Sequence, residues 1–137
     1  MHAKEMLQVR PNDLSDVDAE VLAECIEACF ACAQACTACA DACLSEDAVA
    51  ELTHCIRTDL DCADLCEAVG RMLSRRTAYD VNVDDAFLEA CASVCGACAE
   101  ACATHAGTHE HCRICAEACE RCERACRRLI DVRRVVA

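Results

Sequence analysis

The sequence predicts an all-α protein, an antiparallel four-helix bundle that follows an N-terminal arm or a short extra helix. Cysteines recur at alternating steps of four and three residues in several segments, which is the spacing of one face of an α-helix. A mean step of about 3.5 residues matches the core positions of coiled-coil-like bundles. Alanine, which favours helix, fills many positions between the cysteines, and the only proline, Pro11, precedes all of them.

The chain has 137 residues, which is enough for one domain. We expect residues 1–16 to form the N-terminal arm, with a helix-capping signal at Ser15 or Asp16. Residues 17–137 should form the bundle. Its first long helix is expected over residues 17–44, where the cysteine pattern runs without a break.

Ser45 is expected to cap the second helix, with Glu46 and Asp47 in a first turn where acidic side chains favour the helix dipole. This helix should continue to Arg75 or Arg76, whose positive charge suits the C-terminal end of a helix. The predicted connection between the first two helices is therefore short, and short connections favour antiparallel neighbours.

Asn82 or Asp84 is expected to cap the third helix, which should extend to about Ala106 and end at Gly107. Thr108 is expected to open the fourth helix, which continues towards the C-terminus. This second short turn places the last two helices antiparallel as well.

Each predicted helix carries cysteines on one face, so all 18 thiols should point into the same interior. Aromatic residues are only 2 % of the chain, so an ordinary core of large side chains is not available. The first row of thiols alone would span about 27 Å at the helical rise. The cysteines are Cys25, Cys29, Cys32, Cys36, Cys39, Cys43, Cys55, Cys62, Cys66, Cys91, Cys95, Cys98, Cys102, Cys112, Cys115, Cys119, Cys122 and Cys126.

Two ordinary explanations for this cysteine content do not suit the pattern. A buried cysteine is often only a small apolar residue, but 18 of them in register are not expected on that ground. A disulfide scaffold would suit a secreted protein, yet the first residues, MHAKEMLQVRPND, lack an apolar run after a basic one. We therefore expect a cytoplasmic protein with reduced thiols, which favours soft metal ions as the contents of the core.

The charge and hydropathy of the chain exclude two kinds of partner. A net charge of −12 argues against nucleic acid, because phosphate binding needs a basic surface. No stretch reaches the roughly 18 uninterrupted apolar residues of a membrane span, so no membrane partner is expected.

The spacing of the thiols favours Cu(I) among the soft metals. Thiols four residues apart on a helix, such as Cys32 and Cys36, can hold one two-coordinate ion, whereas zinc needs four ligands in a tetrahedron. If each thiolate bridges two ions and each Cu(I) takes two sulfurs, the core holds on the order of 18 ions. One proton leaves for each Cu(I) that binds, so the core stays neutral. A zinc or general soft-metal buffering and detoxification protein stays open as the alternative.

Enzymatic classes fit the pattern poorly. A thiol-redox enzyme would use one exposed CxxC at a helix N-terminus, and here every CxxC lies within a longer row. A di-iron bundle would need two ExxH motifs, and the only ExxH runs from Glu51 to His54. We expect a protein that is not an enzyme.

Four cysteine-rich strings carry a resemblance to a known family. They are CIEACFACAQACTACADAC, CIRTDLDCADLC, CASVCGACAEAC and CRICAEACERCERAC. The chain resembles the cytosolic branch of the bacterial copper storage proteins, which are four-helix bundles lined with cysteines. The resemblance implies storage of multiple Cu(I) ions and assembly as a homotetramer. Copper ions are then the expected partners, and a copper chaperone is the candidate protein partner.

Further candidate ligands lie among the histidines and acidic residues. His54, His105, His109 and His111 gather at one end of the predicted bundle. At about 100° per residue, His105 and His109 continue the cysteine face of the third helix, so they are the candidates for the first ligands of an incoming ion, with solvated turn histidines as the alternative. Asp59 fills a gap in the cysteine face of the second helix, so its carboxylate either faces the thiols or, after a small twist, the solvent.

Overall fold

The computed structural model describes residues 1–12, 14 and 18–136 of the chain, and within these residues it is helical with no strand. The all-α prediction is therefore confirmed. The helices are α1 (Ala3–Val9), α2 (Ala19–Leu44), α3 (Thr53–Leu73), α4 (Val81–Ala103) and α5 (Glu110–Val136), with a short 3₁₀ helix, η1 (Val49–Glu51), before α3.

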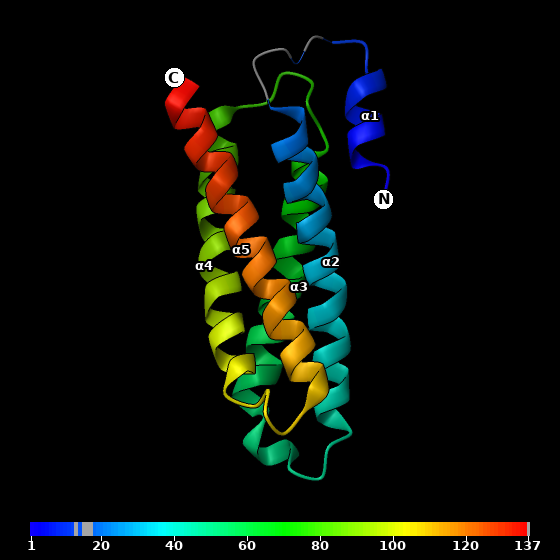
Figure 1. Ribbon diagram of the computed structural model, residues 1–137, viewed down its shortest axis with the longest axis vertical. Helices are drawn as coiled ribbons and strands as arrows, with labels where there is room; N and C mark the ends of the chain where they lie inside the picture. Colours follow the sequence, from blue (N-terminus) through cyan, green and yellow to red (C-terminus); the bar gives the residue numbers. More distant parts are fainter. Residues whose placement is uncertain (13, 15–17, 137) are drawn as a thin grey trace.

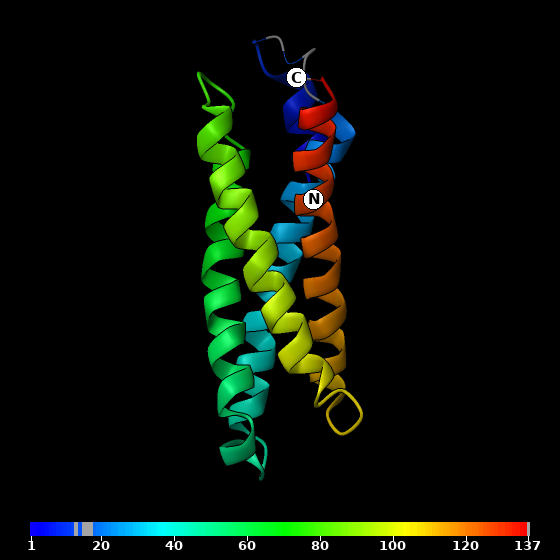
Figure 2. The same ribbon diagram turned by 90° about the vertical axis from the view of Figure 1, so that its left-hand side faces the viewer.

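The four long helices form the predicted antiparallel bundle (Figure 1). Helix α2 packs against α3 and α5, and α4 packs against the same two helices. The view turned by 90° shows the four helices side by side along one axis (Figure 2). Helix α1 lies outside the bundle against α2, so the short extra helix belongs to the N-terminal segment.

The two ends of the bundle differ in what they contain. The connections 45–52 and 104–109 lie together at one end, which we call the histidine end because it holds His54, His105, His109 and His111. The connection from α3 to α4 and the C-terminus of α5 lie at the opposite end, which we call the clasp end.

The first long helix begins close to its predicted position. Asp18 is the N-cap of α2, and its carboxylate accepts the backbone N–H groups of Glu20 and Val21. The predicted capping signal at Ser15 or Asp16 and the boundary between arm and bundle lie outside the described residues.

The prediction that Ser45 begins the second helix is wrong. Ser45 is helical in its backbone angles and ends α2, with its N–H donating to the carbonyl of Ala42. The N–H of Glu46 then bonds to the carbonyl of Cys43, so the acidic residues form a turn and not a first helical turn. Helix α3 starts only at Thr53, after η1 has brought Leu52 into the core with 1 % exposure. Burial of the Leu52 side chain favours this later start, and the acidic residues after Ser45 give no sign of it in the sequence.

Two helices end earlier than predicted. Helix α3 ends at Leu73, not at residues 75–76, and α4 ends at Ala103, not at Ala106. Gly107 lies in the turns that follow α4 but has no positive φ, so it is not the left-handed residue that would terminate the helix.

Two helices also start at other residues than predicted. Asp80 caps α4, because its carboxylate accepts the first free N–H groups of the helix, at 2.9 and 3.4 Å. Asn82 and Asp84 therefore lie inside the helix, and the carboxylate of Asp84 accepts hydrogen bonds from Arg76 and Arg133. Helix α5 begins at Glu110, so Thr108 belongs to the preceding turn.

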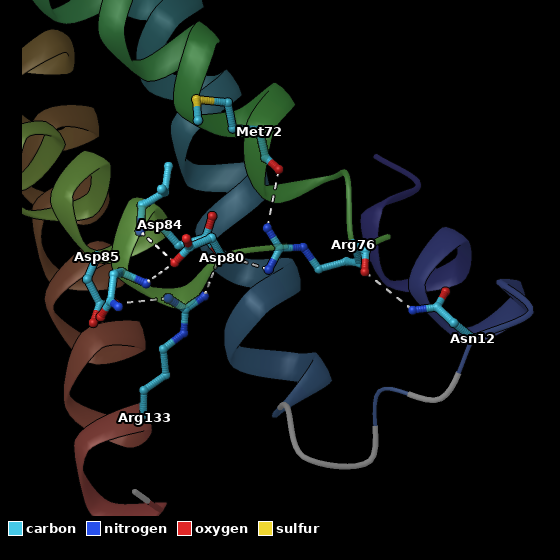
Figure 3. Close-up of polar contacts among 9 residues, drawn as sticks. Asn12, Met72, Arg76, Asp80, Asp84, Asp85 and Arg133 are labelled. Atoms are coloured by element: carbon cyan, nitrogen blue, oxygen red, sulfur yellow. Dashed lines mark hydrogen bonds and ion pairs between the residues drawn. The ribbon is translucent and has the colours of Figure 1, made fainter. Parts of the chain in front are cut away.

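The clasp end is closed by a buried ion network and by leucines. Arg76 folds inward and donates to Asp84 Oδ2 at 2.9 Å, and Arg133 donates to the same oxygen at 3.2 Å (Figure 3). Arg133 also reaches Asp85 at 3.0 Å, and Asn12 bonds to the backbone carbonyl of Arg76. The network therefore joins four parts of the chain. These are the N-terminal segment, the connection between α3 and α4, helix α4 and helix α5. Below it lie the fully buried apolar side chains Leu22, Val69, Leu73, Leu88 and Leu129.

Helices α2 and α4 are long and apolar enough to span a membrane by length and composition alone. Neither helix contains an uninterrupted apolar run of that length, because isolated charged residues interrupt the apolar ones. Of the most apolar stretch of each helix, 56 % is buried inside the bundle in α2 and 44 % in α4. Core helices of soluble bundles are often as long and as apolar, so these two properties alone are weak evidence for a membrane span.

Candidate metal centre

All 18 cysteines are free thiols inside the bundle. Their side chains are 0–1 % exposed, and each of the four long helices contributes some of them. The expectation that the cysteine rows face one interior is confirmed. The thiols replace the large side chains that an ordinary bundle would place there.

The sulfurs form a continuous network of close contacts. Within a helix, Cys32 and Cys36 lie 3.8 Å apart, as the spacing predicts. Contacts between helices are equally close, with Cys36 Sγ 3.5 Å from Cys119 and Cys55 Sγ 3.3 Å from Cys102. A disulfide would need about 2.05 Å, so these are thiol contacts. A metal bound to one helix therefore has sulfurs of the neighbouring helices within reach.

Groups of four sulfurs lie within 4.8 Å of one another, and the groups share members. One consists of Cys32, Cys36, Cys62 and Cys119, and the next of Cys36, Cys98, Cys115 and Cys119. Sharing means that a sulfur belongs to two potential sites at once, which is the arrangement that bridging thiolates require. Soft, low-coordinate Cu(I) suits such bridging.

Asp59 lies inside the thiol network with no exposed surface. Its Oδ1 is 3.1 Å from Cys98 Sγ, 3.2 Å from Cys115 and 3.3 Å from Cys102. Burial raises the pKa of this carboxyl to about 9, so it is neutral at pH 7 in the metal-free protein. Of the two orientations that the sequence allowed, the structure has the one that faces the thiols.

His111 is the histidine that reaches the thiols. Its Nδ1 lies 3.4 Å from Cys39 Sγ and 3.6 Å from Cys112 Sγ. Together with Cys43 these three residues form a mixed group of four potential ligands at the histidine end. Burial raises the pKa of Cys43 to about 11 and that of Cys112 as well, so these thiols carry protons at neutral pH until a metal displaces them.

The other three histidines of the histidine end do not continue the cysteine row of α4. Helix α4 ends at Ala103, so the helical projection that aligned His105 and His109 with that row does not apply to them. His109 instead stacks on His111, with ring centroids 5.5 Å apart, and its Nδ1 pairs with the carboxylate of Glu46. His105 is half-buried in the turn, and His54 is exposed at the start of α3.

The sequence does not indicate Glu46 as a site residue. It predicts only that the negative charge of Glu46 favours the dipole at the start of the second helix. The turn after α2 brings its Oε2 to His109 and to within 3.6 Å of His111 Nε2. The only sequence signal for this position is its place three residues after Cys43, at the end of a cysteine row.

Comparisons with known proteins agree with this chemistry. The family model described as copper storage protein matches residues 18–131. The copper storage protein Ccsp from Streptomyces lividans, solved with 10 copper equivalents, is 61 % identical with a TM-score of 0.92, and the match covers 94 % of this chain and 98 % of that chain.

Two further structures are similar to this chain. One is a cytosolic copper storage protein from Streptomyces lividans with five coppers, which is 65 % identical, with a TM-score of 0.81 over 82 % of this chain and 93 % of that one. The other is the Cu(I)-bound copper storage protein BsCsp3, which is 36 % identical, with a TM-score of 0.69 over 77 % of this chain and 93 % of that one. The family model covers most of the bundle, and the chain therefore belongs to the copper storage protein family.

Proposed function

We propose that this protein stores many Cu(I) ions in the cytoplasm, bound to the thiolates that line its bundle. The observation that carries the proposal is the set of four-sulfur groups that share cysteines along the core. The copper-loaded and Cu(I)-bound relatives support the choice of metal, and the cytosolic relative supports the compartment. The role is sequestration, and no reaction is assigned to the protein.

Thiolates of all 18 cysteines are the proposed ligands. Each Cu(I) takes two sulfurs and releases about one proton, so a neutral thiol core becomes a neutral copper–thiolate core. Asp59 offers an oxygen among Cys98, Cys102 and Cys115, where it can bind an ion or accept a released proton. His111 offers Nδ1 at the last group of thiols before the solvent.

We propose that copper is exchanged through the histidine end. At the clasp end the ion network and five fully buried apolar side chains stand between the thiols and the solvent. At the histidine end, His111 lies 27 % exposed while its Nδ1 faces the thiols. An imidazole is a weaker ligand for Cu(I) than a thiolate, so an ion bound there can move inward. His109 stacks on this ring, and His105 in the turn after α4 and His54 at the start of α3 are further candidate ligands for incoming ions.

We also propose that residues 17–137 are the storage unit, that residues 1–16 are an arm, and that four copies assemble. The family resemblance supports the tetramer, and a copper chaperone is the proposed donor or acceptor. An apolar groove of about 660 Å³ between α1 and α2, lined by Met6, Leu7, Ile26 and Phe30 among others, offers a surface for such assembly. Sedimentation of the metal-free and copper-loaded protein tests the tetramer.

One titration tests the storage function. Cu(I) is added under anaerobic conditions to the reduced protein in the presence of a competing Cu(I) chelator. We expect saturation at about one ion per cysteine, on the order of 18 per chain. Saturation near four ions would instead indicate tetrahedral tetrathiolate sites and would favour the zinc-buffering alternative.

A further inference from the structure

The turn between α2 and η1 places one carboxylate against two stacked histidines. Glu46 Oε2 pairs with Nδ1 of His109 and lies 3.6 Å from Nε2 of His111. The side chains are partly buried, with 30 % of Glu46, 15 % of His109 and 27 % of His111 exposed. The N–H of Glu46 bonds to the carbonyl of Cys43 at 3.2 Å, so its position is fixed to the end of the thiol row.

His111 can ligate copper only in one of its two neutral forms. Its Nδ1 faces Cys39 and Cys112, so this nitrogen must be the one without a proton if it is to bind a metal. The proton then resides on Nε2, which is buried and, among the described residues, has no hydrogen-bond partner. A donor in that state is costly unless an acceptor approaches it.

We propose that Glu46 is a positioning residue for copper uptake, which holds the proton of His111 on Nε2 and so presents Nδ1 to the incoming ion. A shift of roughly 0.5 Å converts the 3.6 Å separation into a hydrogen bond of ordinary length. Metal-bound histidines commonly donate their second N–H to a carboxylate, which orients the ring and raises its basicity. The proposal rests on the proposed function, because it requires copper to pass the histidine end.

The same connection supplies a matched control. Glu51, at the end of η1, is exposed and carries the same charge. If Glu46 acted only by attracting cations to the histidine end, loss of the charge at Glu51 would slow uptake in a similar way. If Glu46 acts by accepting a hydrogen bond, Glu46→Gln should retain much of its effect, because the amide oxygen can accept the same bond.

Two measurements test the proposal. Two-bond ¹H–¹⁵N correlation spectra of the metal-free protein report which nitrogen of His111 carries the proton, and we expect Nε2 in the wild type and a mixture of both forms in Glu46→Ala. Anaerobic stopped-flow transfer from a Cu(I)–chelator complex should then be about tenfold slower in Glu46→Ala, close to wild type in Glu46→Gln and unchanged in Glu51→Ala. Adding Glu46→Ala to His111→Ala should slow transfer no further than His111→Ala alone.

The final capacity should be the same in all these variants, because no thiol is lost. A proton on Nδ1 of His111 in the wild type would overturn the proposal, and so would equal slowing by Glu46→Ala, Glu46→Gln and Glu51→Ala. A wild-type capacity near four ions would instead overturn the storage function itself, and it is measured separately from the transfer rates. Circular dichroism of each variant confirms that the bundle is intact.

Discussion

Replacing Asp59 with asparagine should make the metal-free protein more stable at neutral pH. The carboxyl of Asp59 has an ordinary pKa of 3.8, and burial raises it to about 9 in the folded protein. Below pH 3.8 the group is protonated in both states and contributes nothing. Between these pKa values the folded protein retains a proton that the unfolded chain releases, so stability falls as the pH rises.

The size of the effect follows from the same shift. Each pH unit above 3.8 lowers the free energy of unfolding by about 1.4 kcal/mol, which amounts to at most about 4 kcal/mol at pH 7. Above about pH 9 the loss becomes constant. Asparagine has nearly the shape of the neutral carboxyl but does not titrate, so Asp59→Asn should remove this loss.

Urea unfolding of the reduced, metal-free proteins between pH 4 and pH 9, followed by circular dichroism, measures the difference. The variant and the wild type should be nearly equal in stability at pH 4, and the variant should gain with each pH unit. Asp61→Asn is the matched control, because Asp61 lies on the same helix with its side chain 55 % exposed in an ion pair with Arg57. Curves for Asp59→Asn and the wild type that stay parallel over this range would refute the reasoning.

Three further outcomes are expected. Replacing both Cys32 and Cys36 with alanine should lower the Cu(I) capacity by about two ions in the chelator titration, and an unchanged capacity would contradict bridging by every thiol. The reduced, metal-free protein should already show a helical circular dichroism spectrum, because protonated thiols act as small apolar residues, and a coil spectrum that turns helical only with copper would contradict this. Arg76→Ala should destabilise the protein by about 3 kcal/mol in chemical denaturation, because it leaves the buried carboxylate of Asp84 with one partner, and the loss should exceed that of the exposed Arg57→Ala.

The part of the site that lies within helices could be predicted from the sequence. A regular helix converts sequence spacing into direction, so the cysteine rows follow from about 100° per residue, whereas the same projection left open whether Asp59 faces the thiols or the solvent. The same projection failed for His105 and His109, because α4 ends at Ala103 and the rule has no meaning beyond a helix end. His111 reaches the thiols from the first turn of α5, so only the true start of that helix reveals it.

The contacts of the connections could not be predicted. From the sequence, Arg76 is expected at the C-terminal end of a helix, where its positive charge favours the dipole. In the structure its side chain extends into the core and donates to Asp84, which also accepts from Arg133. Glu46 suited a helix start, but the buried side chain of Leu52 requires a 3₁₀ turn that moves the start of α3 to a later residue. Both outcomes depend on long-range packing, which overrides local preference for charge and capping.

The two ends of the bundle have opposite effects on its stability, and this difference allows the storage function. The leucines and the buried ion network hold the helices together at the clasp end without any metal. The histidine end keeps a buried carboxyl and a buried imidazole nitrogen that lower stability while the protein is empty. Copper relieves the cost at Asp59, because it supplies positive charge beside the carboxylate, and on Nδ1 it fixes the proton of His111 on Nε2, where Glu46 can accept it. Loading should therefore stabilise the histidine end more than the clasp end, and hydrogen exchange should slow most in the helical turns around Cys39, Asp59 and Cys112. Equal slowing at both ends would show that copper stabilises the bundle only as a whole.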